Sequence, residues 1–158
     1  MKLMKTEFPV PVDYFARMIS KFFRSPVTNL QCFPLKGDAS DRNYFRIKFK
    51  SHKTYKSSIV AMTQINPPIR KDIPFVTIQA FLKKCGIMVP KLYFIDSKKG
   101  FIFLDDLGDI SLEKRLNAST REEQEMYFKK ALDILLNMQV ECTKRISKDI
   151  PAYHLAFD

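Results

Sequence analysis

Hydrophobic residues recur at helical spacing in three stretches of the chain. The first covers residues 13–24 and ends before Pro26, because proline disfavours helical geometry in the residue that precedes it. The second covers residues 73–85 and is followed by a glycine at the usual position of a left-handed cap. The third begins near Thr120, where Thr-Arg-Glu-Glu matches the capping-box pattern. These stretches predict three helices, with a short helical start before the last one at residues 111–114.

Between the helices, apolar and polar residues alternate with a period of two, which is typical of strands. The clearest alternation lies in residues 44–50, and further strands are predicted at 58–63, 91–96 and 101–104. A polar, glycine-containing turn at 36–42 indicates a hairpin with one more strand before it. The order of elements predicts an α+β domain: a five-stranded antiparallel sheet with one packed helix, flanked by an N-terminal helix and C-terminal helices.

Composition supports a single folded domain. The chain has 158 residues, of which 46% are hydrophobic, so residues 1–158 can bury a core without disulfides or metals. Charged residues interrupt every apolar run, and the N-terminal residues lack the apolar segment of a secretory signal. We therefore expect a cytoplasmic protein with no membrane partner. Cys32, Cys85 and Cys142 have no metal-ligand spacing and are expected to be reduced thiols.

The chain is basic, with a formal net charge of +10 from 27 Lys and Arg against 17 Asp and Glu. Such a charge is compatible with a nucleic-acid partner. However, positive residues occur singly or in pairs such as Lys83-Lys84, and lysine outnumbers arginine, the better reader of phosphate and base edges. A solvated lysine-rich surface is the simpler interpretation, and nucleic acid remains an alternative partner.

The usual signatures of enzymes are missing from the sequence. His52 and His154 have no His or Cys neighbour at the spacing of metal ligands. The serine-hydrolase elbow, the Walker-type phosphate loop and the dinucleotide-binding glycine pattern do not occur. Sequence patterns therefore predict no catalytic residue and no metal ligand in this chain.

Three segments in a meaningful order carry a resemblance to known kinases. They are Gly-Asp-Ala-Ser-Asp-Arg-Asn-Tyr-Phe-Arg at 37–46, Gly-Ile-Met-Val-Pro at 86–90 and Gly-Phe-Ile-Phe-Leu-Asp-Asp-Leu-Gly-Asp at 100–109. Together they resemble the aminoglycoside phosphotransferase family, in particular its bacterial kinases that phosphorylate cell-wall sugars such as N-acetylmuramate and N-acetylglucosamine at the anomeric carbon. The resemblance covers residues 10–155 and implies the N-terminal lobe of a protein-kinase-like fold.

The resemblance also implies an ATP site. Small side chains in the turn let backbone N–H groups approach a phosphate, and its arginine adds charge-assisted hydrogen bonds. After the fifth strand, the carbonyl of Asp105 and the N–H of Leu107 are expected to read adenine. The implied site residues are Gly37, Asp38, Ala39, Ser40, Asp41, Arg42, Met62, Asp105, Asp106 and Leu107. The simpler interpretations are an ordinary polar hairpin turn and a solvated acidic loop that includes Asp109.

Two departures from the kinase pattern limit what the resemblance implies. Aligning Val60-Ala61-Met62-Thr63 with Val-Ala-Ile-Lys puts Thr63 at the position of the phosphate-binding lysine, and Gln79 replaces its glutamate partner. The amino-sugar kinases resemble this lysine-free pattern. No His-Gly-Asp-type loop, with its aspartate base and its magnesium ligands, occurs before Asp158. The chain alone is therefore expected to be inactive, and magnesium is expected only if another chain supplies a catalytic lobe.

Three functions remain open at this point. In the first, residues 10–109 are the nucleotide-binding lobe of an ATP-dependent amino-sugar phosphotransferase, and residues 110–158 begin a truncated helical lobe. A second polypeptide would then carry the catalytic lobe and the amino-sugar site, docking on an exposed apolar face of helix 120–140. In the second, the chain is a nucleotide- or protein-binding module without catalysis. In the third, its basic surface binds nucleic acid.

Overall fold

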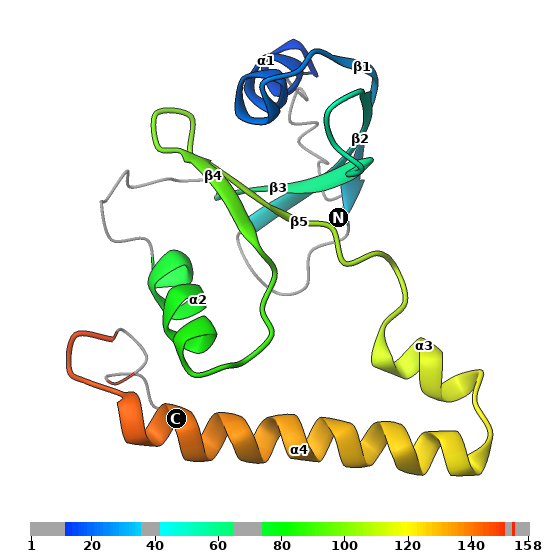
Figure 1. The fold of residues 1–158 in the computed structure, drawn as a ribbon, viewed down its shortest axis with the longest axis vertical. Coiled ribbons are helices and arrows are strands. Elements are labelled where there is room, and N and C mark those ends of the chain that lie inside the picture. The colour runs from blue at the N-terminus through cyan, green and yellow to red at the C-terminus, as the bar shows by residue number, and fades with distance from the viewer. Residues whose placement is uncertain (1–11, 36–41, 65–73, 151–152, 154–158) are drawn as a thin grey trace, which may run out of the picture. The chain divides into compact units, whose positions relative to one another are not determined.

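The computed structural model describes residues 12–35, 42–64, 74–150 and 153, and Figure 1 shows their arrangement in the chain. The elements in order are α1 (Val12–Phe23), β1 (Val27–Leu35), β2 (Arg42–Ser51), β3 (Ser58–Gln64), α2 (Pro74–Lys84), β4 (Leu92–Asp96), β5 (Phe101–Asp105), α3 (Leu112–Asn117) and α4 (Arg121–Arg145). They divide into two compact units. The first comprises residues up to 68 together with 91–106, and the second comprises 69–90 together with the residues from 107 onward.

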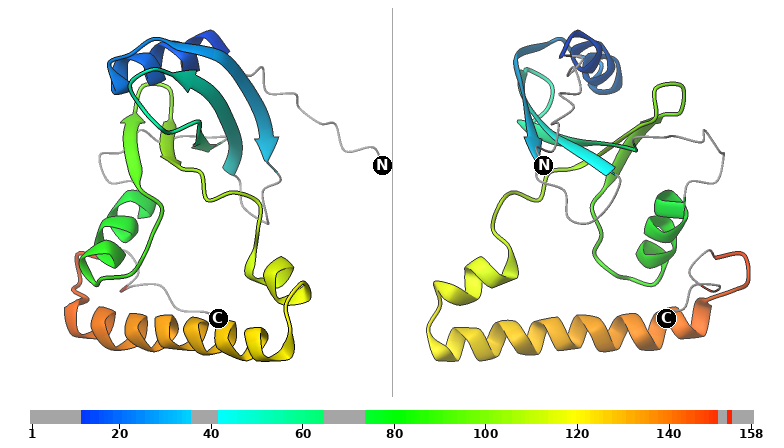
Figure 2. Two further views of the ribbon diagram at one scale, coloured as in Figure 1. Left: turned by 45° about the vertical axis from the view of Figure 1, so that its right-hand side comes forward. Right: turned by 180° about the vertical axis from the view of Figure 1, so that it is seen from behind.

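The first unit contains a five-stranded sheet in the order β1-β2-β3-β5-β4, with every pair antiparallel. This confirms the predicted five-stranded antiparallel sheet of an α+β fold. Its strands and the helix at the N-terminal end can be followed in two further views (Figure 2). The β1 strand begins at Val27 and its pairing with β2 is irregular between Thr28 and Gln31.

Helix α1 packs directly on one face of this sheet. Phe15 and Ile19 are completely buried, and the Phe15 ring meets the rings of Phe101 and Phe103 edge-on at centroid distances of 5.1 and 5.8 Å. Edge-to-face packing of this kind adds to the free energy gained from burial alone. The predicted N-terminal helix is confirmed, and its side chains form the centre of the sheet's core.

Strand alternation gives the three central strands two distinct faces. The α1 face carries Phe45, Ile47, Ile59, Ala61, Phe101 and Phe103, all in the core cluster with α1. The opposite face, here called the Met62 face, carries Val60, Met62, Ile102 and Leu104, none more than 9% exposed. Register places Arg46 opposite Val60 and Tyr44 opposite Met62, so both β2 residues belong to the Met62 face.

The described elements of the second unit are helices, and the helix caps predicted from the sequence are present in it. The capping box at Thr120 is present, because its hydroxyl accepts from the Glu123 N–H while the Glu123 carboxylate accepts from the Thr120 N–H. Ser111 caps α3 through the N–H of Lys114 at 3.2 Å. Near the other end of α4, the Arg145 guanidinium donates to the carbonyl of Lys84. Helices α2 and α4 also contact each other within this second unit.

Helix α4 carries a large apolar surface that is open to solvent. The exposed apolar residues are Met126, Phe128, Leu132, Ile134, Leu135, Leu136, Met138 and Val140. At 100° per residue they cover more than half of the circumference of the helix, which is far wider than the stripe of a surface helix. The exposed apolar face predicted for residues 120–140 is therefore confirmed. Among the described residues, no helix has the length and apolar character that crossing a membrane requires.

The packing of α1 predicts a large penalty for shortening Phe15. Because its ring is fully buried among other aromatic rings, Phe15→Ala should lower the free energy of unfolding by about 3–5 kcal/mol, measured by urea unfolding of the first unit. The matched control is Phe33→Ala, since Phe33 on β1 is 42% exposed and its ring lies 5.6 Å from the Lys48 ammonium on the surface. That change should cost about 1 kcal/mol or less. Equal losses would contradict the assignment of α1 as a core helix.

Candidate functional site

The structure describes half of the predicted nucleotide site. Gly37, Asp38, Ala39, Ser40 and Asp41 lie outside the described residues. Arg42 is the first residue of β2, Met62 lies in β3, and Asp105 ends β5. Asp106 and Leu107 follow directly along the chain. Met62 and Asp105 therefore come from two neighbouring strands of one sheet, and Asp106 follows the second of them.

Arg42 lies at the end of the sheet where β1 is connected to β2. It stands opposite Gln64 in the antiparallel register, and its own side chain is half-buried. The predicted phosphate turn directly precedes it in the sequence. A guanidinium at this place is well suited to a phosphate, because its planar fork can donate two parallel hydrogen bonds to the same group.

Strand alternation separates Met62 from Thr63. Thr63 pairs with Phe101 and lies on the α1 face, where it is buried. Met62 pairs with Ile102 and lies on the opposite face, on the same side as Arg46. Thr63, which the alignment matches to the kinase lysine, therefore faces the α1 core. Met62, the residue before it, faces the side of the sheet on which Arg46 lies.

Arg46 and Asp106 form a bidentate ion pair on the Met62 face. Arg46 Nε donates to Asp106 Oδ2 at 2.8 Å, and Nη2 donates to Oδ1 at 2.9 Å. The side chains are 11% and 7% exposed. Two short, parallel, charge-assisted hydrogen bonds in a water-poor setting fix the position of the carboxylate in two directions. Removing one partner of such a pair costs about 3–5 kcal/mol, because the other charge is left buried.

Asp105 is held on the other side of the same segment. Its Oδ1 accepts from Lys56 Nζ at 2.7 Å and from the Tyr93 hydroxyl. Burial raises the pKa of Asp105, but the hydrogen bonds from Lys56 and Tyr93 outweigh it and the pKa is lowered. The pKa of Lys56 is raised, chiefly by its hydrogen bond to Asp105. The pKa of Tyr93 is raised by burial and by the same carboxylate.

These contacts overturn the simpler interpretation of residues 105 and 106. Both carboxylates are engaged in ion pairs, and their side chains are only 23% and 7% exposed, so they are not part of a solvated acidic loop. The backbone is held as well, because the N–H of Asp105 donates to the carbonyl of Lys91 at 2.8 Å. Leu107 differs from both, since its side chain is 73% exposed. Within the described residues, no hydrogen bond uses the N–H of Leu107.

Sequence reasoning missed Arg46. It identified Asp106 but could not identify a partner 60 positions earlier in the chain. One signal was available, because Arg46 alternates with the apolar residues Phe45 and Ile47 in the middle of a predicted strand. Arg46 stands opposite the apolar residue Val60. When this face of the sheet is buried, the arginine needs an acidic partner, because an unpaired buried charge is costly.

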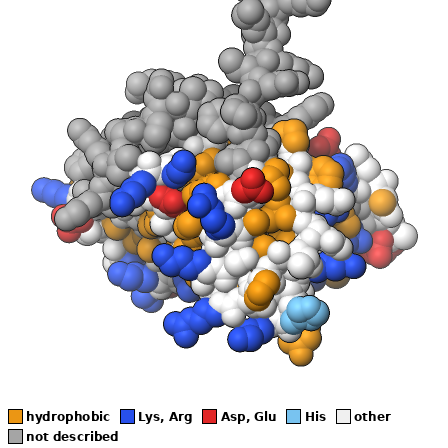
Figure 3. All heavy atoms as spheres, turned by 90° about the horizontal axis from the view of Figure 1, so that it is seen from above, with side chains coloured by type: hydrophobic (Ala, Val, Ile, Leu, Met, Phe, Trp, Pro, Cys, Tyr) orange, Lys and Arg blue, Asp and Glu red, His pale blue; other side chains and the backbone are white. Residues whose placement is uncertain are grey.

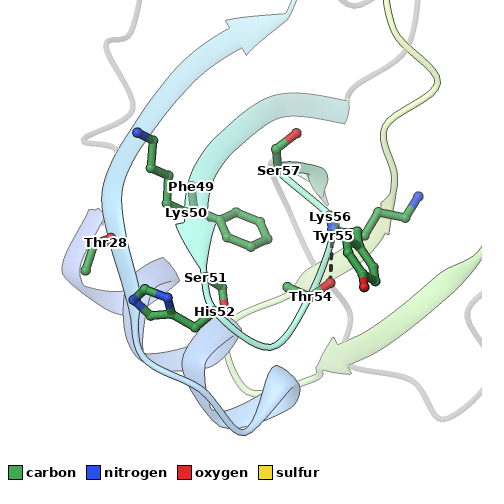
Figure 4. Close-up of a pocket in the computed structure, with 9 residues that line it drawn as sticks. All are labelled: Thr28, Phe49, Lys50, Ser51, His52, Thr54, Tyr55, Lys56 and Ser57. Carbon is green, nitrogen blue, oxygen red and sulfur yellow. Dashed lines mark hydrogen bonds between the residues drawn. The ribbon is translucent and has the colours of Figure 1, made fainter.

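A separate hollow lies at the hairpin between β2 and β3, far along β2 from Arg42 (Figure 4). It has a volume of about 360 Å³ and is lined by Thr28, Phe49, Lys50, Ser51, His52, Thr54, Tyr55, Lys56 and Ser57. Lys56 donates its backbone N–H to Thr54 Oγ1, which closes the turn.

Across the described ranges, no three His, Cys, Asp or Glu side chains gather in a way that could hold a metal ion.

Basic side chains do not form one patch on the face of the molecule seen in Figure 3. On the face of the molecule seen in Figure 3, Lys and Arg side chains are spread among apolar and neutral ones. Several lysines are already engaged, such as Lys56 with Asp105 and Lys144 with Glu141 at 2.9 Å. A nucleic-acid surface would require a continuous basic stripe, which this face does not display.

Comparison with known proteins gives a specific similarity. No family model matches the chain. The chain is 33% identical over 110 residues to the N-acetylmuramate/N-acetylglucosamine kinase of Pseudomonas aeruginosa, which is 69% of this chain and 30% of that protein. It is 33% identical over 114 residues to the protein of the same name from Pseudomonas putida, covering 72% of this chain and 30% of the relative. The chain thus spans about 30% of the length of these relatives, and its resemblance to amino-sugar kinases is confirmed.

Proposed function

We propose that this chain is the nucleotide-binding part of an ATP-dependent kinase that phosphorylates an amino sugar. The observation that carries the proposal is the similarity to two N-acetylmuramate/N-acetylglucosamine kinases over about 70% of the chain. The five-stranded sheet supports it, because a kinase N-terminal lobe is built on such a sheet. In this proposal, residues 10–109 form the nucleotide-binding lobe and residues 110–158 begin the helical lobe.

The proposed ATP site runs along the Met62 face from the β1–β2 turn to the end of β5. Gly37 to Asp41 supply backbone N–H groups for the phosphates, and Arg42 supplies a positive charge next to them. The carbonyl of Asp105 and the N–H of Leu107 hydrogen-bond the adenine edge. Met62, 2% exposed, belongs to the apolar floor of the face. Asp106 belongs to the site through the backbone segment that its side chain holds in place.

The residues of this chain bind and orient the nucleotide but do not complete the chemistry. Phosphoryl transfer needs an aspartate to accept the proton of the acceptor hydroxyl and carboxylates to hold magnesium beside the phosphates. The described residues offer no acidic cluster for that metal. ATP supplies the transferable phosphoryl group when bound. We therefore propose that the 158 residues alone do not transfer it at a useful rate.

The exposed apolar surface of helix α4 supports the proposal that a partner polypeptide binds this chain. A helix that is apolar over most of its circumference is normally buried, yet Leu132 and Leu136 are both 57% exposed. The relatives contain more than twice as much sequence outside the matched part as within it. We propose that a helical polypeptide corresponding to that remaining sequence, carrying the catalytic lobe and the amino-sugar site, covers α4. Nucleic acid is not favoured as a partner, because the basic side chains on the face seen in Figure 3 are dispersed.

A ligand titration tests the nucleotide site. ATP, adenosine and tripolyphosphate should each raise the melting temperature of the purified chain in a saturable way, because they bind only the folded state. At one hundred times the dissociation constant the stabilisation should reach about 2.7 kcal/mol. Magnesium is varied independently, so that its effect on the phosphates is seen separately from that of the base.

Two variants test whether the response to ATP depends on the proposed phosphate contact. Arg42→Gln should weaken the response to ATP and tripolyphosphate but leave the response to adenosine, since Arg42 is proposed to face the phosphates. Lys50→Gln removes an exposed charge at the other end of the same strand and should change none of them. The absence of any shift at millimolar ATP in a folded protein would overturn the proposed nucleotide site.

A chimera tests the proposed cover of α4. This chain is fused to the part of the Pseudomonas aeruginosa kinase that lies beyond the matched 110 residues. Leu132→Glu should lower the melting temperature of the chimera by several degrees but leave that of the chain alone unchanged, because the side chain becomes buried only in the chimera. Lys130→Glu, on the polar side of α4, is the matched control and should change neither. An equal effect of Leu132→Glu in both proteins would contradict the proposed cover.

A further inference from the structure

We propose that Arg46 is a positioning residue for adenine, because it fixes Asp106 and thereby orients the backbone of residues 105–107. This inference rests on the proposed nucleotide site and adds a specificity-determining residue to it. Arg46 itself lies two residues after Tyr44 in β2 and is not among the residues expected to touch the nucleotide. Its action on the ligand is therefore indirect.

The two carboxylates are anchored on opposite sides of the chain. Ile59 stands opposite Asp105 in the register, which places Asp105 on the α1 side, where Lys56 and Tyr93 bind it. The next residue of an extended chain points the other way, and Asp106 reaches Arg46 on the Met62 face. Residues 105 and 106 are thus held from both faces of the sheet at once.

Such opposed anchors restrict the peptide group between Asp105 and Asp106. The N–H of Asp105 donates to the carbonyl of Lys91 and fixes the preceding peptide group, so the Asp105 carbonyl is restricted by this bond together with the two side-chain anchors. Because Arg46 contributes two hydrogen bonds, of 2.8 and 2.9 Å, to a carboxylate only 7% exposed, it is the stronger of the two anchors.

A fixed orientation matters here because the base is read by backbone groups. Adenine presents an amino donor next to a ring-nitrogen acceptor, whereas guanine presents a carbonyl acceptor next to a ring N–H donor. A carbonyl at Asp105 and an N–H at Leu107 match the first pattern and oppose the second. Each mismatched polar group left without a partner costs free energy, so the discrimination depends on how rigidly the segment is held.

The test compares two variants of the pair with a matched control. Arg46→Lys keeps the positive charge but loses the planar fork, and the double variant Arg46→Met with Asp106→Leu removes both charges and avoids a buried unpaired carboxylate. Lys48→Met is the control, because Lys48 lies on the same strand and the same face but is exposed. Folding of each is checked by its melting temperature, and affinities for ATP, GTP and tripolyphosphate are measured by calorimetry.

Both variants of the pair should bind ATP about tenfold more weakly and lose most of the preference for ATP over GTP, while tripolyphosphate affinity stays unchanged. Lys48→Met should match the wild type throughout. Folded variants that keep the wild-type ATP affinity and ATP/GTP ratio would overturn the role of Arg46 and leave the proposed nucleotide site standing. A wild-type protein that binds no nucleotide would instead contradict the proposed site itself.

A measurement on the wild type covers the case in which the variants do not fold. The Arg46 Nε–H should give a slowly exchanging NMR signal in the free protein and keep it in the presence of saturating ATP, because the ion pair exists before binding and persists in the complex. Loss of that protection when ATP binds would show that the pair opens, and would overturn the inference.

Discussion

The alternation of side chains along β2, β3 and β5 is the constraint on which the rest of the first unit depends. One set of alternate residues is used by α1, whose Phe15 ring is enclosed by aromatic rings of the sheet. The other set is therefore left for the Met62 face, where Arg46 reaches Asp106. A shift of one residue in the pairing of β2 with β3 would exchange the two sets and bury charged residues against α1. Both the core against α1 and the Arg46–Asp106 pair therefore depend on this strand register.

The two anchors at the end of β5 differ in their physical character. The Lys56–Asp105 pair involves a lysine that is 48% exposed, and pairs of this kind contribute little to stability. The Arg46–Asp106 pair is almost entirely removed from water, so its geometry is strict and its disruption is costly. A buried ion pair is weak support for stability as such. Its value here is that it holds the Asp106 carboxylate in one orientation on the Met62 face.

The sequence predicted the sheet well, whereas the nucleotide site stays a prediction and one of its contacts, Arg46 with Asp106, was not foreseen. The strands at residues 44–50 and 58–63 were recognisable because alternation is a local property that needs no knowledge of the partner. The central role of α1 was not recognisable, since its apolar residues show that it packs but not against which element. Arg46 was missed because its partner is distant in the sequence. Thr63 was matched to the kinase lysine by alignment alone, and only the register shows that it lies on the α1 face.

The most direct test of the proposed nucleotide site is an NMR titration of the isotope-labelled chain with ATP, followed through the backbone amide signals. We expect saturable shifts at residues 37–42, at Met62 and at 105–107, with no change in the hairpin of residues 51–57 that borders the hollow in Figure 4. Shifts concentrated in that hairpin, or none along the Met62 face, would contradict the proposed nucleotide site.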